Sequence, residues 1–390
     1  MQQNSLGRRD FLVRASSAAL PLLIGSANPR AHAKEAIPSA AGLIVRQEVP
    51  LNLESPFASL DGVITPTAKF FVRNHFAVPA LAAQDWQLQV LGNVERELKV
   101  SLADLKRLPA TTLTATMECA GNGRAFLDPA TKGVQWETGA VGNAEWTGVP
   151  LARVLEKAGV KDSTVEVVLV GADRGEIAAD PKPAGPIHFA RSLPLKKALQ
   201  SEVLLAFQMN AEELSPQHGY PVRAVVPGWY GMASVKWLTK IIVAATPFQG
   251  YWQTFDYSYF QANSGEPVMK PITEMQVKAT IARPTSQEKI SAGSKYRIAG
   301  AAWAGSSQIA NVEVSTSAGK QWESAKLLGQ AVPFSWRLWE FSWNVPKQKG
   351  KHEILVRATD ENGNSQPLER DANRRNYLIN HVIPRVVEIT

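Results

Sequence analysis

Cys119 is the only cysteine in the 390-residue chain, and it lies in the stretch TMECAGNGRAF at residues 116–126. A lone thiol can be a small buried hydrophobe, a nucleophile or a metal ligand. A Gly-Asn-Gly turn follows at residues 121–123, and Arg124 lies five residues after Cys119. The stretch combines a soft sulfur donor with a nearby cation, and by itself it leaves all three roles open.

Several common catalytic motifs are missing from the sequence. It contains no GxxxxGK[ST] phosphate loop, no GxSxG nucleophile elbow, no HExxH zinc motif and no CxxCH haem motif. A Cys–His nucleophile is possible in principle, with His75, His188 or His218 as the base. No supporting motif surrounds any of these histidines.

Basic residues beside aromatic ones recur along the chain. Arg73 and His75 follow Phe-Phe-Val, the run HGYPVR occupies residues 218–223, and Lys236 precedes a tryptophan. Taken singly, each island has a structural explanation, such as a surface ion pair, a capped turn or a solvated strand end. Only their combination around one thiol indicates a function.

The elements that must position these residues predict an α+β protein. The predicted strands of this part cover residues 87–91, 165–170, 203–207, 222–226 and 237–244. The predicted helices begin at Ser101, which is a suitable N-cap, and cover residues 151–158 and 193–199. Helices and strands mix without a regular βαβ period, which favours α+β over a doubly wound fold.

The sequence changes character near Asn-Ser-Gly-Glu-Pro at residues 263–267. The predicted strands beyond this point cover residues 273–281, 295–301, 309–315, 335–343 and 352–359. Turn signals separate them and helix signals are nearly absent, which predicts an immunoglobulin-like β-sandwich without the Cys–Trp–Cys pattern of antibody domains. Because the chain is too long for one ordinary core, we expect domains at residues 34–265 and 266–390.

Residues 1–33 read as a twin-arginine signal peptide. Arg8 and Arg9 lie in GRRDFL, a weakly apolar run follows, and Ala31-His-Ala33 is a small-residue cleavage site. The apolar run is too short and too rich in Ser, Gly and Pro to span a membrane. A disordered basic arm is the alternative. The expected location is the periplasm, with no membrane span in the mature chain, and this route carries folded proteins that already hold a cofactor.

The charge of the chain argues against nucleic acid as a partner. The whole sequence has a net charge of +7, and residues 1–33 contain four Arg and one Asp, so the mature chain has 7 − 3 = +4. This mild excess has no concentrated basic stripe, although it suits an anionic substrate. Export also places Cys119 in an oxidising compartment without a disulfide partner, so it must be buried or occupied.

The chain resembles the sulfite oxidase family of molybdenum enzymes over residues 45–390. The motifs that carry the resemblance are FVRNH at 71–75, ECAGN at 118–122 with Arg124, GAV at 139–141 with Trp146, MN at 209–210, HGYPVR at 218–223, VKW at 235–237 and SWRLW at 335–339. Each motif is weak alone. Their shared order along a two-domain layout makes the resemblance specific.

The resemblance implies a mixed α/β molybdopterin-binding domain of the sulfite oxidase type, followed by an immunoglobulin-like β-sandwich dimerisation domain. It implies molybdenum with molybdopterin as the cofactor and Cys119 as the thiolate on the metal, and a soft sulfur donor suits such a centre. The other residues that it assigns to the cofactor are His75, Asn122, His218, Arg223 and Lys236.

The resemblance also implies an anion pocket. The residues that it assigns to substrate binding and catalysis are Arg73, Arg124, Trp136, Tyr257 and Arg337. Trp136 would form an aromatic wall, and Arg337 would reach the pocket from the second domain. Charge-assisted hydrogen bonds of about 1.5–3 kcal/mol each would replace the hydration of the anion. The implied reaction is periplasmic oxidation of sulfite to sulfate by oxygen-atom transfer at a Cys-ligated Mo-oxo centre.

Two departures from the family pattern change what we expect of the anion pocket and of the electron acceptor. Gly123 stands where animal members carry another arginine, so the anion pocket is expected to be less positive or to open differently. The sequence has no haem-binding motif, so we expect electrons to leave singly to a separate acceptor such as cytochrome c. We also expect a homodimer formed through residues 266–390.

Alternative functions remain. A sulfane dehydrogenase subunit of a thiosulfate-oxidising complex, with a cytochrome c partner, resembles this chain across both domains. A nitrate-reducing or sulfoxide-reducing relative is less well supported, because reductases of the sulfoxide type generally lack the C-terminal sandwich. A non-catalytic exported binding protein is the alternative from another class.

Overall fold

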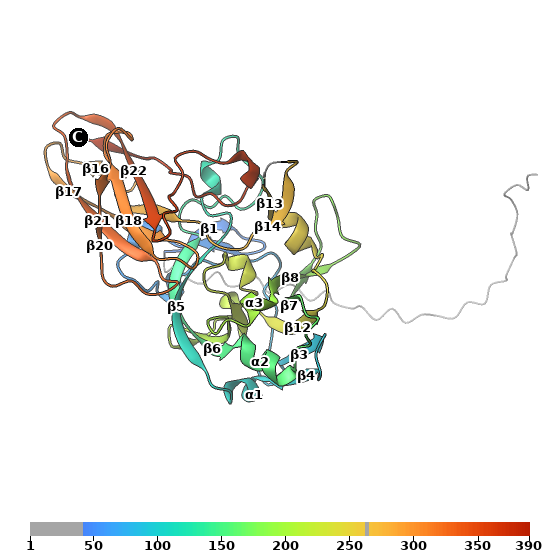
Figure 1. Ribbon diagram of the computed structural model, residues 1–390. Coiled ribbons are helices and arrows are strands. Elements are labelled where there is room, and N and C mark those ends of the chain that lie inside the picture. The colour runs from blue at the N-terminus through green and yellow to red at the C-terminus, as the bar shows by residue number, and fades with distance from the viewer. Residues whose placement is uncertain (1–41, 262–264) are drawn as a thin grey trace, which may run out of the picture. The chain divides into compact units, whose positions relative to one another are not determined.

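The computed structural model describes residues 42–261 and 265–390, which belong to one compact unit (Figure 1). The predicted signal peptide at residues 1–33 and part of the predicted boundary at residues 263–267 lie outside the described residues. Within the described ranges, no helix is long and apolar enough to cross a membrane.

The first large sheet contains the strand that leads into the cysteine stretch. Its order is β10-β9-β6-β5, with β11 also paired to β9, and all pairs are antiparallel. Its strands are β5 (Thr111–Glu118), β6 (Val141–Pro150), β9 (Leu204–Met209), β10 (Glu212–Glu213) and β11 (Arg223–Val225). Glu118 lies opposite Val141 at the end of the β5–β6 ladder, so Cys119 is the first residue beyond the strand.

The second large sheet has the order β4-β3-β12-β7-β8. Its strands are β3 (Gln87–Gly92), β4 (Leu98–Ser101), β7 (Glu166–Gly175), β8 (Ile187–Pro194) and β12 (Leu238–Ala244). β12 is parallel to β3, and the other pairs are antiparallel. Mixed strand directions without a βαβ repeat confirm the α+β prediction for this part of the chain.

Three short α-helices accompany these sheets. They are α1 (Leu102–Lys106), α2 (Leu151–Ala158) and α3 (Leu195–Ala198). The Ser101 hydroxyl accepts a hydrogen bond from the Asp104 N–H at 3.1 Å, which caps α1 as predicted. α2 ends at Gly159, whose φ of +70° suits glycine. The predicted helix at 193–199 is shorter in the structure, because residues 193–194 belong to strand β8 and pair with β7.

Short single helical turns lie in the segments that connect these elements. The 3-10 turns are η1 (Phe57–Ser59), η2 (Thr67–Lys69), η3 (Arg124–Phe126), η4 (Pro216–His218), η5 (Gly231–Ala233) and η7 (Ala372–Arg374). η6 (Tyr251–Asp256) is a π-helical turn that the sequence pattern did not predict, and Tyr257 follows it directly.

The C-terminal part is a β-sandwich of two sheets, visible in Figure 1 as the orange and red strands. One sheet has the order β15-β17-β21-β20 and the other β16-β23-β22-β18-β19. The strands are β15 (Lys278–Arg283), β16 (Lys289–Ile290), β17 (Lys295–Trp303), β18 (Ile309–Ser315), β19 (Glu323–Ser324), β20 (Lys326–Leu327), β21 (Arg337–Asn344), β22 (Gly350–Asp360) and β23 (Arg385–Ile389). The predicted β-sandwich is confirmed, although its first strand begins at Lys278 rather than near residue 273.

Two further pairs of strands complete the fold. They are the hairpins of β1 (Ile44–Gln47) with β2 (Asn52–Glu54) and of β13 (Ser258–Gln261) with β14 (Val268–Pro271).

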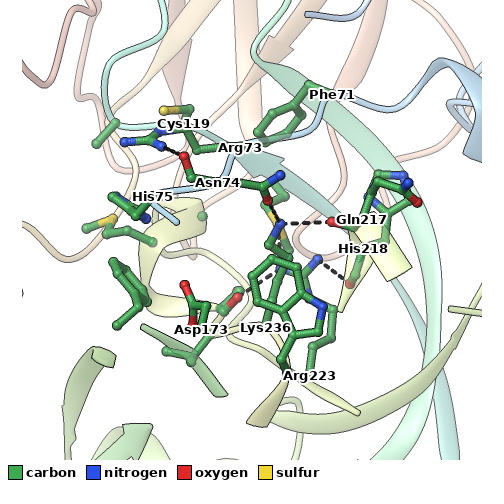
Figure 2. Close-up of a pocket in the computed structure, with 18 of the residues that line it drawn as sticks. Phe71, Arg73, Asn74, His75, Cys119, Asp173, Gln217, His218, Arg223 and Lys236 are labelled. Atoms are coloured by element: carbon green, nitrogen blue, oxygen red, sulfur yellow. Dashed lines mark hydrogen bonds between the residues drawn. The ribbon is translucent and has the colours of Figure 1, made fainter. Parts of the chain in front are cut away.

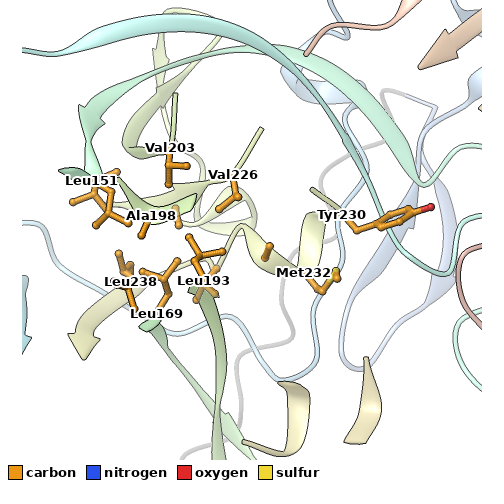
Figure 3. Packing of buried hydrophobic residues seen from close by; sticks show 14 of the residues in the cluster. Leu151, Leu169, Leu193, Ala198, Val203, Val226, Tyr230, Met232 and Leu238 are labelled. Carbon is orange, nitrogen blue, oxygen red and sulfur yellow. The ribbon is translucent and has the colours of Figure 1, made fainter. Parts of the chain in front are cut away.

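The largest hydrophobic cluster connects the two parts of the unit. Leu151, Leu169, Leu193 and Val203 pack within it, and Figure 3 shows these side chains meeting in one interior. The same cluster contains residues of the C-terminal part, namely Ala282, Ala301, Trp303, Trp336, Tyr377 and Leu378. Each large apolar side chain buried in this way contributes about 1.5–3 kcal/mol. The sandwich also has a separate cluster around Trp339 and Ile354.

Candidate active site

Two adjoining cavities meet at the cysteine. The inner cavity holds about 660 Å³ of space outside the protein atoms, mouth included, and the outer one holds about 1850 Å³ by the same measure. The residues that line both cavities are Arg73, Asn74, His75, Cys119 and Tyr257. Cys119 therefore lies on a wall shared by a narrower chamber and a wider, more open one.

Cys119 is held at the start of a tight turn. Its backbone N–H donates to the Ala140 carbonyl at 2.9 Å, and its carbonyl accepts from the Asn122 N–H at 2.9 Å. The thiol is free, and 7% of the residue is exposed. A Cβ at Gly121 would lie 2.3 Å from the Arg124 guanidinium, so only glycine lets the turn pass this close to the cation.

Asn122 braces this turn from beneath and does not line either cavity. Its side-chain N–H donates to the Glu118 carboxylate at 3.0 Å, and its side-chain oxygen accepts from the Ala140 N–H at 3.0 Å. The residue is 1% exposed. Its side chain is therefore engaged within the turn, and the contact between the backbone of this turn and a cofactor that the resemblance implies stays a prediction.

Arg223 brings an uncompensated positive charge to the inner cavity. Its guanidinium donates to the carbonyls of His218 at 3.1 Å and Ser234 at 2.9 Å, and it lies 5.0 Å from the centre of the Trp146 ring. Within the described residues it forms no ion pair with a carboxylate. Burial lowers the pKa of Arg223 to about 9, because the charged form loses its hydration.

His218 and Lys236 complete the basic lining. Burial first, and then the charges of Lys236 and Arg223, lower the pKa of His218 to about 3, so its ring is neutral at pH 7. The Lys236 ammonium donates to the Gln217 carbonyl at 2.8 Å and to the side-chain oxygen of Asn74. Figure 2 shows Lys236, His218 and Arg223 converging on the cavity, with Cys119 and Arg73 at its other side.

Asp173 is the carboxyl group of the inner cavity. It is 4% exposed, and its Oδ1 atom has no hydrogen-bond partner in the part of the chain that the structure describes. Burial raises its pKa to about 7, although the charges of Lys236 and Arg73 oppose that shift. Sequence reasoning did not select Asp173, because an aspartate within a strand carries no motif of its own.

His75 and Tyr257 form a hydrogen-bonded pair at the junction of the two cavities. The His75 Nε2 atom and the Tyr257 hydroxyl are 2.7 Å apart, and the imidazole stacks on Phe189 with ring centres 4.3 Å apart. Burial, followed by the charges of Arg73 and Lys236, holds the pKa of His75 well below its usual value. Burial also raises the pKa of Tyr257, so the pair is a neutral imidazole and a protonated phenol.

The outer cavity is lined by three arginines that lack carboxylate partners. Within the described ranges, none of Arg73, Arg124 and Arg375 forms an ion pair. Arg124 donates to the carbonyls of Asn376 at 3.1 Å and Val134 at 2.9 Å, and it is 4% exposed. Burial lowers the pKa of Arg73, but Tyr257, Cys119 and nearby acidic groups together raise it above its usual value. The wall therefore presents positive charge to a small anion.

Arg375 was missed by sequence reasoning. Its guanidinium donates to the Phe255 carbonyl and to the Ser258 hydroxyl, both at 2.8 Å. Arg46 and Lys132 also line the outer cavity. These residues lie in a short hairpin strand or in irregular segments, where hydrophobic periodicity gives no signal, and only the adjacent pair Arg374-Arg375 could have drawn attention.

Two predicted residues lie outside both cavities. Trp136 is completely buried in the cluster around Phe70 and Cys119, and its indole N–H has no partner. Arg337 begins β21 opposite Ala302 of β17 and donates to the Gly329 carbonyl at 3.0 Å. Arg337 is not among the residues that line the two cavities, whereas Arg375 of the C-terminal part lines the outer one.

Comparisons with known proteins agree with this geometry. The family model described as an oxidoreductase molybdopterin binding domain matches residues 75–252, and the model described as a Mo-co oxidoreductase dimerisation domain matches residues 269–383. Mitochondrial sulfite oxidase of Mus musculus is 34% identical over 343 residues, which cover 83% of this chain. The chain spans 61% of the length of that relative.

Two further likenesses cover more of the compared protein. Sulfite oxidase of Gallus gallus is 35% identical over 350 residues, which are 85% of this chain and 74% of the relative. The structure is also similar to the crystal structure of the sulfane dehydrogenase SoxCD from Paracoccus pantotrophus, with a TM-score of 0.76 and 30% sequence identity over 88% of each chain.

The cofactor is molybdenum with molybdopterin, and the inner cavity fits that group. Its wall carries one free thiol at the boundary with the outer cavity. Arg223 offers a buried positive charge that no carboxylate among the described residues pairs with, and this suits a phosphate. The unpartnered Asp173 oxygen can accept an N–H from a ring.

The matched domains, the relatives and the thiol-centred cavities lead to one conclusion. The chain belongs to the sulfite oxidase family of molybdopterin-dependent oxidoreductases.

Proposed function

We propose that this protein oxidises sulfite to sulfate in the periplasm and passes the electrons singly to a separate carrier such as cytochrome c. The observation that carries the proposal is the position of Cys119 on the wall shared by the inner and outer cavities. A metal bound there could receive a substrate from the outer cavity while its cofactor fills the inner one. Sulfite oxidase relatives at about 34–35% identity support this substrate.

On the inner side, the chain holds the cofactor. Cys119 would supply its thiolate to the metal, since soft sulfur ligands suit such a centre. Arg223 and Lys236 would bind the phosphate, and the neutral His218 would donate or accept a hydrogen bond beside them. When bound, the molybdenum centre supplies two-electron oxygen-atom transfer chemistry. The protein contributes orientation and electrostatic stabilisation.

On the outer side, the chain binds and orients the anion. Arg73 and Arg124 offer guanidinium N–H donors whose protein partners are neutral, so their charge is available to sulfite. Each charge-assisted hydrogen bond is worth about 1.5–3 kcal/mol. Arg375 is placed to add a third cation as sulfate forms. Partial burial of these donors excludes water and strengthens the attraction.

The Tyr257 hydroxyl stays protonated while the substrate is bound. Burial raises its pKa above its usual value, so the hydroxyl is protonated at neutral pH. The hydroxyl can donate to an oxygen of the anion, or to His75 when His75 Nε2 is the acceptor. We therefore assign Tyr257 the role of a neutral donor that orients the substrate, and His75 the role of holding that hydroxyl.

The test measures steady-state oxidation of sulfite by purified protein that is loaded with molybdenum. The reaction is monitored through the reduction of cytochrome c and, in a separate assay, through the reduction of ferricyanide. We expect both acceptors to be reduced in proportion to sulfite consumed. Reduction of ferricyanide alone would remove cytochrome c from the proposal and retain sulfite. No sulfite oxidation by protein that contains a full complement of metal would overturn the proposal.

A sulfane dehydrogenase is the second candidate. The structural likeness to SoxCD favours it, and the outer cavity, which is wider and more open than the inner one, is compatible with a substrate larger than sulfite. Turnover of a carrier-bound sulfane together with inactivity towards sulfite would replace the first candidate by this one. In either case we propose a homodimer through residues 266–390, which light scattering would check.

A further inference from the structure

The residue before Cys119 is anchored by the C-terminal part of the chain. Glu118 is 1% exposed, and its carboxylate accepts three hydrogen bonds. The Lys278 ammonium donates to Oε1 at 2.8 Å, the Asn122 side chain donates to the same oxygen at 3.0 Å, and the Trp303 indole donates to Oε2 at 2.9 Å. Lys278 and Trp303 belong to sandwich strands β15 and β17.

Lys278 holds both sides of the turn at once. Besides Glu118, its ammonium donates to the Asn122 carbonyl at 3.1 Å, so one cation bridges the residues on either side of Cys119, Ala120 and Gly121. The Lys278 residue is only 2% exposed. A buried ion pair forms a rigid connection only when its remaining polar atoms are satisfied, and both oxygens of Glu118 meet that condition.

A second segment of the C-terminal part supports the same turn. The Leu378 N–H donates to the Ala120 carbonyl at 2.9 Å, and the Asn376 carbonyl accepts from Arg124 at 3.1 Å. The turn from Glu118 to Arg124 is therefore fixed at four of its residues by side chains or backbone from beyond residue 276. Neither Lys278 nor Leu378 lines the two cavities.

We propose that Lys278 is a positioning residue, through which the sandwich sets the orientation of Cys119 and of the cavity wall that the cysteine shares. This inference rests on the proposed function in taking Cys119 as the metal ligand. Without the ammonium, the Glu118 carboxylate is buried with only neutral donors. The free-energy cost of this buried charge is reduced if the turn moves towards water. That movement displaces the thiol.

The experiment compares three variants of the full chain. Lys278→Met removes the cation, and the double variant Glu118→Gln with Lys278→Met removes both charges, so that no unpaired charge is left buried. Arg357→Gln is the control, because Arg357 pairs with Glu313 at 2.8 Å inside the sandwich and does not contact the turn. Thermal unfolding of each variant identifies any that fail to fold.

The readout is the rate at which iodoacetamide alkylates Cys119 in cofactor-free protein. Because Cys119 is the only cysteine, all label reports on this turn. We expect the folded double variant to react about tenfold faster than wild type, as loss of a charge-assisted hydrogen bond makes local opening easier. Arg357→Gln should react at the wild-type rate. An unchanged rate in a double variant that unfolds at the wild-type temperature would overturn the proposal.

Molybdenum content separates this inference from the proposed function. If Cys119 is the ligand, the double variant retains less metal after gel filtration than wild type, and Cys119→Ser retains least. If Cys119→Ser retains full metal, the ligand role fails, and the alkylation result still decides whether Lys278 positions the turn.

Discussion

Gly123 lies against Ile379, and the contact leaves no room for a side chain. A Cβ at Gly123 would be 2.9 Å from the Ile379 Cγ2 atom, and the φ of Gly123 is +100°. This backbone conformation is strained for any L side chain. An arginine at this position requires a different partner at residue 379 and a different turn. The glycine is thus tied to the packing of the C-terminal segment beneath the turn.

We predict that Gly123→Ala lowers the free energy of unfolding by about 1–3 kcal/mol, because it adds a contact and forces a residue into a left-handed conformation. Urea denaturation monitored by tryptophan fluorescence measures the loss. Gly62→Ala is the matched control, since nothing lies within 4 Å of a Cβ there. Equal stability of the two variants would show that Ile379 and the turn adjust freely.

Sequence analysis identified the residues that meet at Cys119 better than the residues that line the more distant walls of the two cavities. Cys119 stood out because it is a single thiol, and Arg73, His75 and Tyr257 do meet it. These residues come from the end of a strand or from irregular segments near one, and it was the resemblance of their motifs to the sulfite oxidase family that suggested a common ligand. The hydrogen bonds of the Asn122 side chain to Glu118 and Ala140 could not be predicted, because a motif does not show which way a polar side chain in a turn points.

Contacts between residues that are far apart in the chain could not be predicted from the sequence. Lys278 and Glu118 are 160 residues apart, and nothing in either neighbourhood reports the other. The family resemblance assigned Arg337 to the anion pocket, yet the register of β21 sets it opposite Ala302. Arg375 follows a 3-10 turn with no periodic pattern, so its arrival at the outer cavity depends on how the whole C-terminal segment folds back.

Replacing Cys119 by serine should leave the fold intact and abolish sulfite oxidation. Serine is close in size and the residue is buried, so thermal unfolding should shift little, whereas a hydroxyl is a poor substitute for a soft thiolate ligand. The measurements are metal content per chain and turnover with ferricyanide. Turnover near the wild-type rate in the serine variant would contradict the ligand assignment.

Arg124 and Arg337 offer a paired test of the anion pocket. Arg124→Gln should lower kcat/KM for sulfite by about tenfold to a hundredfold, since one charge-assisted hydrogen bond to the anion is lost. Arg337→Gln should leave kcat/KM unchanged, because its side chain lies outside both cavities. Steady-state kinetics at matched metal content provides the comparison. A comparable loss in both variants would show that Arg337 reaches the substrate after all.

His218 should make the cofactor-free protein less stable as the pH falls. Its pKa is about 3 in the folded chain against 6.5 for a free histidine, so below pH 6.5 the unfolded chain binds a proton that the folded chain does not. Stability is then lost as the pH drops towards 3. Between pH 6.5 and about pH 5 this one residue should account for about 1.5 kcal/mol.

The measurement for His218 is urea denaturation of cofactor-free wild type and of His218→Gln across that pH range. Asp173 acts in the opposite direction, because its pKa is raised to about 7 and the folded chain binds the extra proton. The comparison of the two proteins cancels this contribution, since Asp173 is present in both. The glutamine variant should therefore show the weaker loss of stability at low pH, and identical slopes in the two proteins would mean that His218 becomes protonated in the folded chain.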